Sequence, residues 1–300
     1  MSTHQVALIH HLEQVFGPRR TVPTHWLRIR PAPHTRATIT AYTLRVGSEP
    51  HFLNWVRDPF ENQVARLDLP EPVANLTLTV ELLADLSPAN PFDFLTEADA
   101  AHFPLDYAEQ TGKELVPYLK PGSGGVRLAA WLESLDDAPG YIVEKLASLN
   151  QAVHARVMAA GLNPAPAFPG MDSDTADSIE LETVLARGGF TPWQAAWLLT
   201  LSCRHLGLAA RFTSGYRIFL DTADATADSA SLHAWAEVFI PGAGWIGLDP
   251  CAGIYTHEGY IPLASTPEPV RALPLTGLDT GVALRHSVTV KRLQPAPTPD

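Results

Sequence analysis

The stretch LHAWAEVFIPGAGWIGLDP, residues 232–250, decides the fold. Its first part, His233 to Ile240, is rich in β-branched and aromatic residues and predicts a strand. The segment 241–244 (PGAG) predicts a tight hairpin turn, and Trp245 to Leu248 predicts the returning strand. Antiparallel pairing across such a hairpin brings His233 and Asp249 close together. The stretch therefore predicts an imidazole beside a carboxylate on adjacent strands.

The segment before this hairpin predicts a buried helix followed by a strand. Pro192 to Leu206 is apolar on most faces, and Pro192 suits a first helical turn because the missing N–H of proline would be unpaired there anyway. Gly207 ends the helix, and Leu208 to Leu220 predicts the first strand of the same sheet. A helix start, then a strand histidine, then an aspartate after the next strand is the order of a Cys-His-Asp triad.

Such a triad has a clear physical basis. A helix N-terminus lowers the pKa of a thiol and favours the thiolate. A histidine on an adjacent strand pairs with the thiolate and shuttles the proton. An aspartate on the neighbouring strand fixes the tautomer and the orientation of the imidazole.

The first half of the chain predicts a β-sandwich. Four segments between residues 25 and 82 alternate apolar and polar residues, with Pro- and Gly-rich turns between them. A connector at residues 88–125 ends in a glycine cluster, which predicts a boundary between an N-terminal β-sandwich domain with its connector, 1–125, and a second domain, 126–300. An apolar stripe predicts a helix within residues 126–162, and a late strand is predicted at Ala283 to Arg292.

Composition excludes several classes of partner. The chain has 300 residues, 18% of them charged, and a formal net charge of -11, so its surface repels phosphate backbones and nucleic acid is not expected. It shows no basic run, no secretory signal and no apolar stretch long enough to span a bilayer, so membrane binding is not expected. Cys203 and Cys251 are too few for a disulfide framework. We expect a cytoplasmic protein.

Two stretches, Leu206–Tyr216 (LGLAARFTSGY) and residues 232–250, resemble the bacterial transglutaminase-like domain of the papain-type cysteine superfamily. Shorter similarities lie at residues 27–34, 52–60, 90–94, 113–118, 259–264 and 266–269. The resemblance implies an α+β fold, in which an N-terminal antiparallel β-sandwich precedes a papain-like transglutaminase core with a helix packed on an antiparallel sheet. The similar subfamily is often joined to, or encoded beside, a circularly permuted ATP-grasp protein and a helical alpha-E protein.

One departure from the family concerns the nucleophile. In the family a cysteine lies in a Gly-Ser-Cys-Arg-Asp type of turn just before an Ala-Trp-Leu-Leu helix. Here Ala196–Leu199 reads AWLL, but the turn before it, Phe190–Gln194, reads FTPWQ. Counting back from Ala196 places the nucleophile position on Pro192. The resemblance therefore implies His233 and Asp249 as triad partners and supplies no cysteine.

Two other side chains are possible substitutes for the nucleophile. Thr191 carries a hydroxyl near the helix start, but a displacement by one residue changes the direction of the side chain. Cys251 lies two residues after Asp249, on an element without a helix dipole. Cys203 falls within the buried helix, where we expect a small apolar core thiol.

Two tryptophans are candidate cleft-lining residues. Trp193 stands beside the nucleophile position, where it would either plug the cleft or stack on a ligand. Trp235 lies two residues after His233, where it would either line the cleft or pack in the core. His4, His10 and His11 lack a defined ligand geometry, so we expect no metal site. We expect no cofactor.

The sequence favours a pseudoenzyme, a transglutaminase-like protein without the catalytic cysteine. The resemblance implies that it binds peptide or amide-containing ligands, or partner proteins of a peptide-ligating system such as the ATP-grasp and alpha-E proteins. The alternative is an active amidase, peptidase or acyltransferase, which would use a relocated nucleophile or a water activated by His233 and Asp249.

Overall fold

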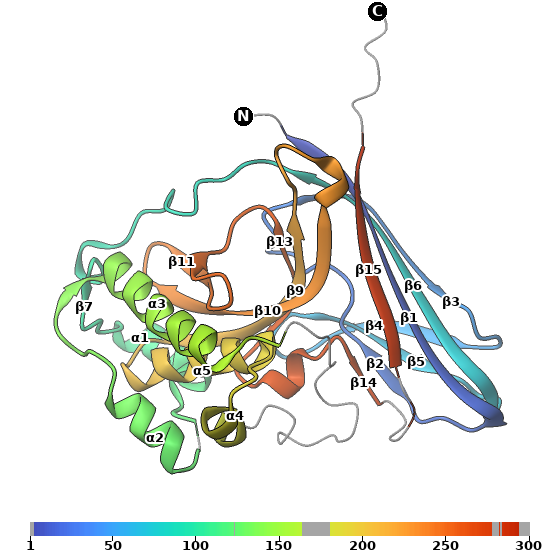
Figure 1. Cartoon of the computed structure of the whole chain (residues 1–300), viewed down its shortest axis with the longest axis horizontal. Helices are drawn as coiled ribbons and strands as arrows, with labels where there is room; N and C mark the ends of the chain where they lie inside the picture. Colours follow the sequence, from blue (N-terminus) through green and yellow to red (C-terminus); the bar gives the residue numbers. More distant parts are fainter. Residues whose placement is uncertain (1–2, 123, 164–180, 278–281, 283, 294–300) are drawn as a thin grey trace, which may run out of the picture.

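The computed structural model describes residues 3–122, 124–163, 181–277, 282 and 284–293. A strand-rich sandwich forms one side of the molecule, the helices form the other, and a curved sheet containing β9 and β10 lies between them (Figure 1). This mixed α+β architecture confirms the predicted fold class.

The helices are α1 (Glu109–Leu119), α2 (Val126–Glu133), α3 (Ile142–Ala160), α4 (Leu181–Arg187) and α5 (Pro192–His205). The strands are β1 (His4–Arg20), β2 (His25–Leu27), β3 (Thr38–Val46), β4 (Phe52–Arg57), β5 (Gln63–Asp68), β6 (Val73–Leu86), β7 (His102–Phe103), β8 (Gly140–Tyr141), β9 (Ala210–Phe219), β10 (Ser229–Ile240), β11 (Gly244–Asp249), β12 (Ile254–Tyr255), β13 (Tyr260–Thr266), β14 (Leu275–Thr276) and β15 (Leu284–Arg292). No helix in the described ranges is both long and apolar enough to cross a membrane.

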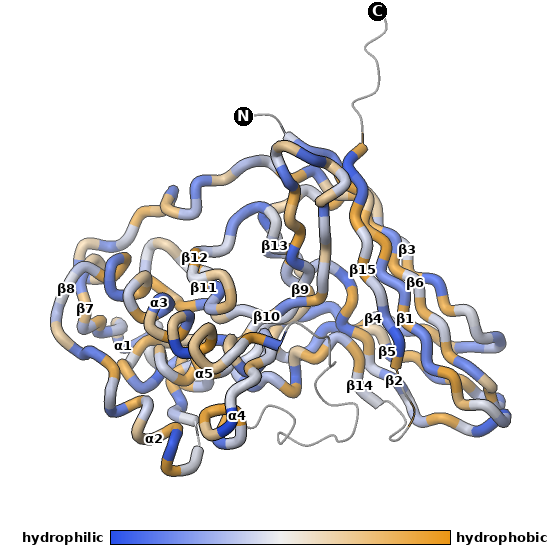
Figure 2. Tube along the Cα trace, in the orientation of Figure 1, coloured by the Kyte–Doolittle hydropathy of each residue, from blue (hydrophilic) through white to orange (hydrophobic). Residues whose placement is uncertain are grey.

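The N-terminal sandwich consists of two antiparallel four-stranded sheets, ordered β15-β1-β6-β3 and β14-β2-β5-β4. Hydropathy alternates along its strands, as Figure 2 shows, because every second side chain faces the core between the sheets. Leu12, Leu78, Leu27 and Leu67 belong to that core. The strands β14 and β15, from the C-terminal part of the chain, complete these two sheets.

The second part consists of a helical layer packed on an antiparallel sheet ordered β12-β11-β10-β9-β13. Helix α5 lies against β9 and β10, and α3 lies against α5. Leu198 and Leu199 of α5 share a core with Ala236 and Val238 of β10. The prediction of a buried helix on this sheet is therefore confirmed.

The sandwich and the second part share buried apolar contacts. Val6 and Leu8 of β1 belong to the same cluster as Tyr216 and Ile218 of β9. Since β9 and β10 also contact α5, one long curved sheet joins the sandwich to the helices (Figure 1).

Two segments differ in detail from the sequence predictions. The helical segment predicted within residues 126–162 is two helices, α2 and α3, separated at residues 134–141. Pro139 and Gly140 explain the break, because neither residue supports a helix interior. The connector before it contains helix α1, with Pro117 inside it.

Candidate functional site

The N-terminus of α5, where the family resemblance places the nucleophile, is closed by a complete helix cap. Thr191 is the N-cap residue, and its Oγ1 accepts a hydrogen bond from the Gln194 backbone N–H at 3.3 Å. The Thr191 backbone N–H and hydroxyl both donate to Gln194 Oε1, at 3.0 and 3.1 Å. Pro192 follows as the first helical residue. This reciprocal pattern is a capping box, so the Thr191 hydroxyl is already engaged in the cap.

Trp193 fills the space beside the first turn of α5. Its side chain is buried and stacks on Phe212, with ring centroids 5.7 Å apart. Its cluster also contains Ala234 of β10 and Ala264 of β13. Trp193, in the first turn of α5, therefore shares a core with Ala234, the residue next to His233.

His233 and Asp249 meet at the end of the β10–β11 ladder. Ala236 pairs with Leu248 in this ladder, so the same register places Asp249 beside Trp235, two residues from His233. His233 Nε2 and Asp249 Oδ2 are 2.8 Å apart, and both side chains are buried. The sequence placed these two groups on adjacent strands, and the structure brings them into direct contact.

Asp249 is held ionised by its neighbours. The Tyr260 hydroxyl donates to Oδ2 at 2.7 Å, and the Cys251 backbone N–H donates to Oδ1 at 2.8 Å. Burial alone would raise the pKa of Asp249, but the His233 ring, the hydrogen bonds from His233 and Tyr260, and the charge of Arg217 together lower it to about 2. Asp249 can therefore orient the imidazole as a carboxylate.

Cys251 lies close to this pair. Its sulfur, a ring nitrogen of His233 and a carboxylate oxygen of Asp249 all lie within 4.8 Å of one another. Burial, followed by the negative charge of Asp249, raises the pKa of the Cys251 thiol well above its usual range, against the opposing charge of Arg217. The group is therefore a neutral thiol and a weak nucleophile in this setting.

Helix α3 holds the turn that carries Cys251. The amide nitrogen of Asn150 donates to the Ile254 carbonyl at 3.1 Å, and that of Gln151 donates to the Gly253 carbonyl. His154 Nδ1 lies 2.9 Å from the Pro250 carbonyl oxygen. These bonds fix the backbone on both sides of Cys251.

The other candidate residues take packing positions. Trp235 is 1% exposed, donates its indole N–H to Glu237 at 3.1 Å, and meets Tyr260 edge to face. Cys203 is fully buried in α5, and burial raises the pKa of its thiol to about 12. Both tryptophans, Trp193 and Trp235, thus present little surface toward a ligand.

Sequence reasoning missed Tyr260 and Arg217 as members of the site. Tyr260 of β13 pairs with Arg217 of β9, and β9 is the neighbour of β10. The Gly259–Ala264 stretch resembles the family, but no local pattern in it indicates that β13 lies on the side of β9 away from β10. The register of that edge strand was the missing information.

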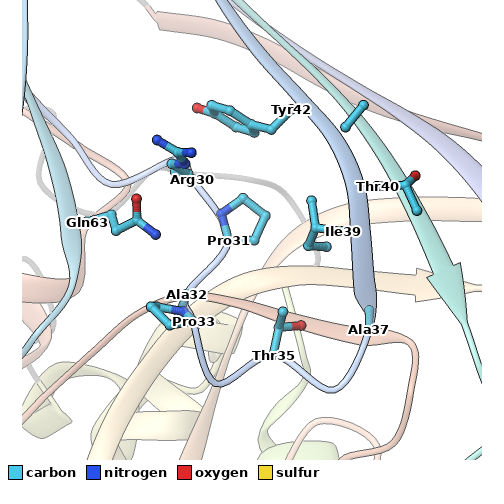
Figure 3. A pocket seen from close by; sticks show the side chains of 11 residues that line it. Arg30, Pro31, Ala32, Pro33, Thr35, Ala37, Ile39, Thr40, Tyr42 and Gln63 are labelled. Atoms are coloured by element: carbon cyan, nitrogen blue, oxygen red, sulfur yellow. The ribbon is translucent and has the colours of Figure 1, made fainter.

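A hollow of about 480 Å³ lies beside the loop between β2 and β3. Figure 3 shows Arg30, Tyr42 and Gln63 gathered around it. The Arg30 guanidinium lies over the rings of Tyr42 and Trp55, 5.3 Å from each centroid. The hydroxyl oxygens of Thr35 and Tyr42 are buried and have no hydrogen-bond partner within the described structure. The hollow therefore offers polar groups that a ligand could satisfy.

Two parts of the chain match known protein families. Residues 6–85 match the bacterial transglutaminase-like N-terminal region, and residues 136–250 match the transglutaminase-like superfamily. No curated protein sequence matches the chain.

One solved structure shares the fold at low sequence identity. A Cytophaga hutchinsonii protein named as a "putative cysteine protease" is 15% identical, with a TM-score of 0.67, and the match covers 100% of this chain and 94% of that one. The periplasmic domain of TgpA from Pseudomonas aeruginosa, bound to ethylmercury, is 17% identical, with a TM-score of 0.35, and the match covers 84% of this chain and 91% of that one. Residues 136–250, which carry the candidate site, thus match the transglutaminase-like superfamily, and the N-terminal region of the bacterial transglutaminase-like proteins precedes them in order.

Proposed function

We propose that this protein is a transglutaminase-like pseudoenzyme that binds peptide or amide-containing ligands, or partner proteins of a peptide-ligating system, without acyl transfer. The observation that supports this most directly is the start of α5. Pro192 occupies the first helical position, Thr191 is engaged in the capping box, and no thiol stands at this helix N-terminus. The His233–Asp249 pair thus lacks the partner that acyl transfer requires.

The electrostatics of the site support the same proposal. A nucleophilic thiol is activated where a helix dipole and an imidazolium favour the thiolate. Here the first residue of α5 is Pro192, which offers no thiol to the helix dipole, and the thiol near His233 is kept neutral by burial and by Asp249. General acid–base assistance from His233 alone typically contributes about 10²- to 10⁴-fold, which leaves little turnover without a nucleophile.

The hollow beside Arg30 supports the binding role. Its guanidinium, the Gln63 amide and the two unsatisfied hydroxyls are suited to the carboxylate and amide groups of a peptide. Partners of the ATP-grasp and alpha-E kinds, which the family resemblance implies, belong to the same proposal. A reducing cytoplasm suits a chain whose two cysteines, Cys203 and Cys251, are both free.

Restoring the nucleophile provides the decisive test. The variant Pro192→Cys should gain His233-dependent alkylation by iodoacetamide at neutral pH, because it places a thiol at the helix N-terminus. The wild type should hydrolyse no peptide amide and transfer no acyl group, and Pro192→Ala is the matched control. Robust wild-type turnover that is abolished by His233→Ala would refute the proposal.

The binding role has its own measurement. Calorimetric titration with acetyl-Ala-Gln-Ala, as the free acid and as the amide, should show binding that is lost in Arg30→Ala. The exposed neighbour Arg36 provides the control variant, Arg36→Ala, which should bind as the wild type does. Equal binding by both variants would remove the hollow from the proposal.

A second candidate function is an active amidase, peptidase or acyltransferase with Cys251 as a relocated nucleophile. The observation that favours it is the Cys251 sulfur within 4.8 Å of a His233 ring nitrogen. Thiol labelling with mass mapping distinguishes the two functions, and Cys203 serves as an internal control. Rapid modification of Cys251 that disappears in His233→Ala would support this candidate, and labelling as slow as that of Cys203 would exclude it.

A further inference from the structure

Three side chains with metal-binding atoms converge at the end of the β10–β11 ladder that lies away from the hairpin turn. They are the imidazole of His233, the carboxylate of Asp249 and the thiol of Cys251, all buried, with donor atoms within 4.8 Å of one another. We propose that His233, Asp249 and Cys251 form a binding site for a thiophilic divalent cation, best suited to Zn²⁺. This goes beyond the proposed function, which requires no metal.

The set of donors selects the kind of cation. Zinc is bound in proteins by thiolate, imidazole and carboxylate at about 2.0–2.3 Å. Ligand atoms of one tetrahedral zinc ion therefore lie roughly 3.3–3.7 Å apart. The three donor atoms lie within 4.8 Å of one another, and His233 Nε2 and Asp249 Oδ2 are 2.8 Å apart, so a shared ion would replace their hydrogen bond and move this pair slightly apart. Hard cations such as Mg²⁺ and Ca²⁺ prefer all-oxygen sites and fit this set poorly.

Three protein ligands leave a fourth position. In zinc sites with three protein ligands, a water molecule occupies that position. The Tyr260 hydroxyl is 2.7 Å from Asp249 Oδ2 and would serve either as a neighbour that holds the carboxylate or as a hydrogen-bond partner of that water. The geometry thus corresponds to an open site.

The ligands are held in place before any cation binds. The Cys251 backbone N–H donates to Asp249 Oδ1, which fixes the carboxylate relative to the turn. Asn150 and His154 of α3 bind the carbonyls on either side of Cys251. Binding therefore orders little additional chain, which favours affinity.

Binding also balances in charge. Zn²⁺ replaces the proton of the Cys251 thiol, the proton passes to solvent, and a Zn–thiolate bond forms. The thiolate and the Asp249 carboxylate together neutralise the cation. Arg217, with Nε 3.8 Å from Asp249 Oδ2, opposes the cation, so we expect weaker binding than at a structural site with four protein ligands.

The test uses the full-length protein with Zn²⁺ in equilibrium dialysis and Co²⁺ in absorption spectroscopy. We expect one Zn²⁺ per chain, and a sulfur-to-Co²⁺ charge-transfer band with tetrahedral d–d bands. Cys251→Ser and His233→Ala should each weaken binding about 100-fold or more, and Cys251→Ser should also remove the charge-transfer band. Cys203→Ser, the matched control at the other cysteine, should bind as the wild type does.

Adventitious binding has a separate control. His4 and His11 are exposed on β1, and the double variant His4→Gln/His11→Gln removes them. If this variant loses Zn²⁺ while Cys251→Ser keeps it, or if the wild type binds none, the proposal is wrong. Zn²⁺ should also raise the melting temperature of the wild type but not of Cys251→Ser, a readout that does not depend on activity. None of these measurements involves turnover, so a lack of Zn²⁺ binding would not bear on the proposed absence of acyl transfer.

Discussion

Asp249 is the residue at which the candidate site converges. Its Oδ2 accepts a hydrogen bond from the Tyr260 hydroxyl at 2.7 Å and lies 2.8 Å from His233 Nε2. All three side chains are buried. Hydrogen bonds to a buried charged group are worth more than neutral ones, about 1.5–3 kcal/mol. The phenol therefore stabilises the ionised carboxylate directly.

Replacing Tyr260 by phenylalanine isolates this contribution. Tyr260→Phe keeps the ring and removes only the hydroxyl, so we expect the free energy of unfolding to fall by about 1.5–3 kcal/mol at pH 7. Urea denaturation measures the change. Tyr141 is 60% exposed, and Tyr141→Phe should leave stability within about 0.5 kcal/mol of the wild type. Equal changes in the free energy of unfolding for the two substitutions would show that the hydrogen bond to Asp249 does not stabilise the protein.

Helix α5 begins with a capping box formed by Thr191 and Gln194. In the capping box, Gln194 Oε1 accepts from the Thr191 backbone N–H and the Thr191 Oγ1 accepts from the Gln194 backbone N–H. A cap of this kind contributes about 0.5–2 kcal/mol. We expect Gln194→Ala to lower the free energy of unfolding within that range, measured by urea denaturation.

Glutamate at the same position is the matched control. Gln194→Glu keeps the accepting oxygen and places a negative charge at the helix N-terminus, which the helix dipole favours. Its stability should equal or exceed that of the wild type by a few tenths of a kcal/mol. If Gln194→Glu were as unstable as Gln194→Ala, the capping role would be wrong, and a packing role for Gln194 would replace it.

Local elements were predictable from the sequence, whereas long-range pairing was not. The hairpin of β10 and β11 follows from its glycine-rich turn, so the approach of His233 to Asp249 could be derived. The distance of Cys251 from His233 depends on the turn after β11, which α3 holds from another part of the chain. No local pattern specifies such contacts.

At the scale of the molecule, the same limit applies to the sheets. The strand β15 was predicted as a strand, but its place beside β1, more than 260 residues earlier, was not. Its alternating pattern fits the edge of any half-buried sheet, so the pattern does not predict which strand pairs with it. The sandwich as a type was predictable because period-two alternation and turns are local signals.

The stability of the whole molecule should depend on buried histidines. Burial first, and then the charges of His286 and His11, lower the pKa of His10 to about 3. Burial lowers the pKa of His25 to about 4, against the opposing influences of the Pro23 carbonyl and Asp68. In the unfolded chain both side chains titrate near the ordinary histidine value of about 6.5. Between these values the unfolded state binds more protons than the folded state.

The free energy of unfolding should therefore rise with pH from about 4 to 6.5 and fall on acidification through the same window. Each histidine contributes a slope approaching about 1.4 kcal/mol per pH unit. His25→Leu removes one titrating group from the sandwich core, so its slope between pH 6 and 4.5 should be shallower by up to that amount. Urea denaturation at a series of pH values measures both slopes, and the exposed His4→Gln variant should match the wild type. If His25→Leu shows the wild-type slope, His25 is not excluded from protonation in the folded state, and the acid sensitivity has to originate elsewhere in the molecule.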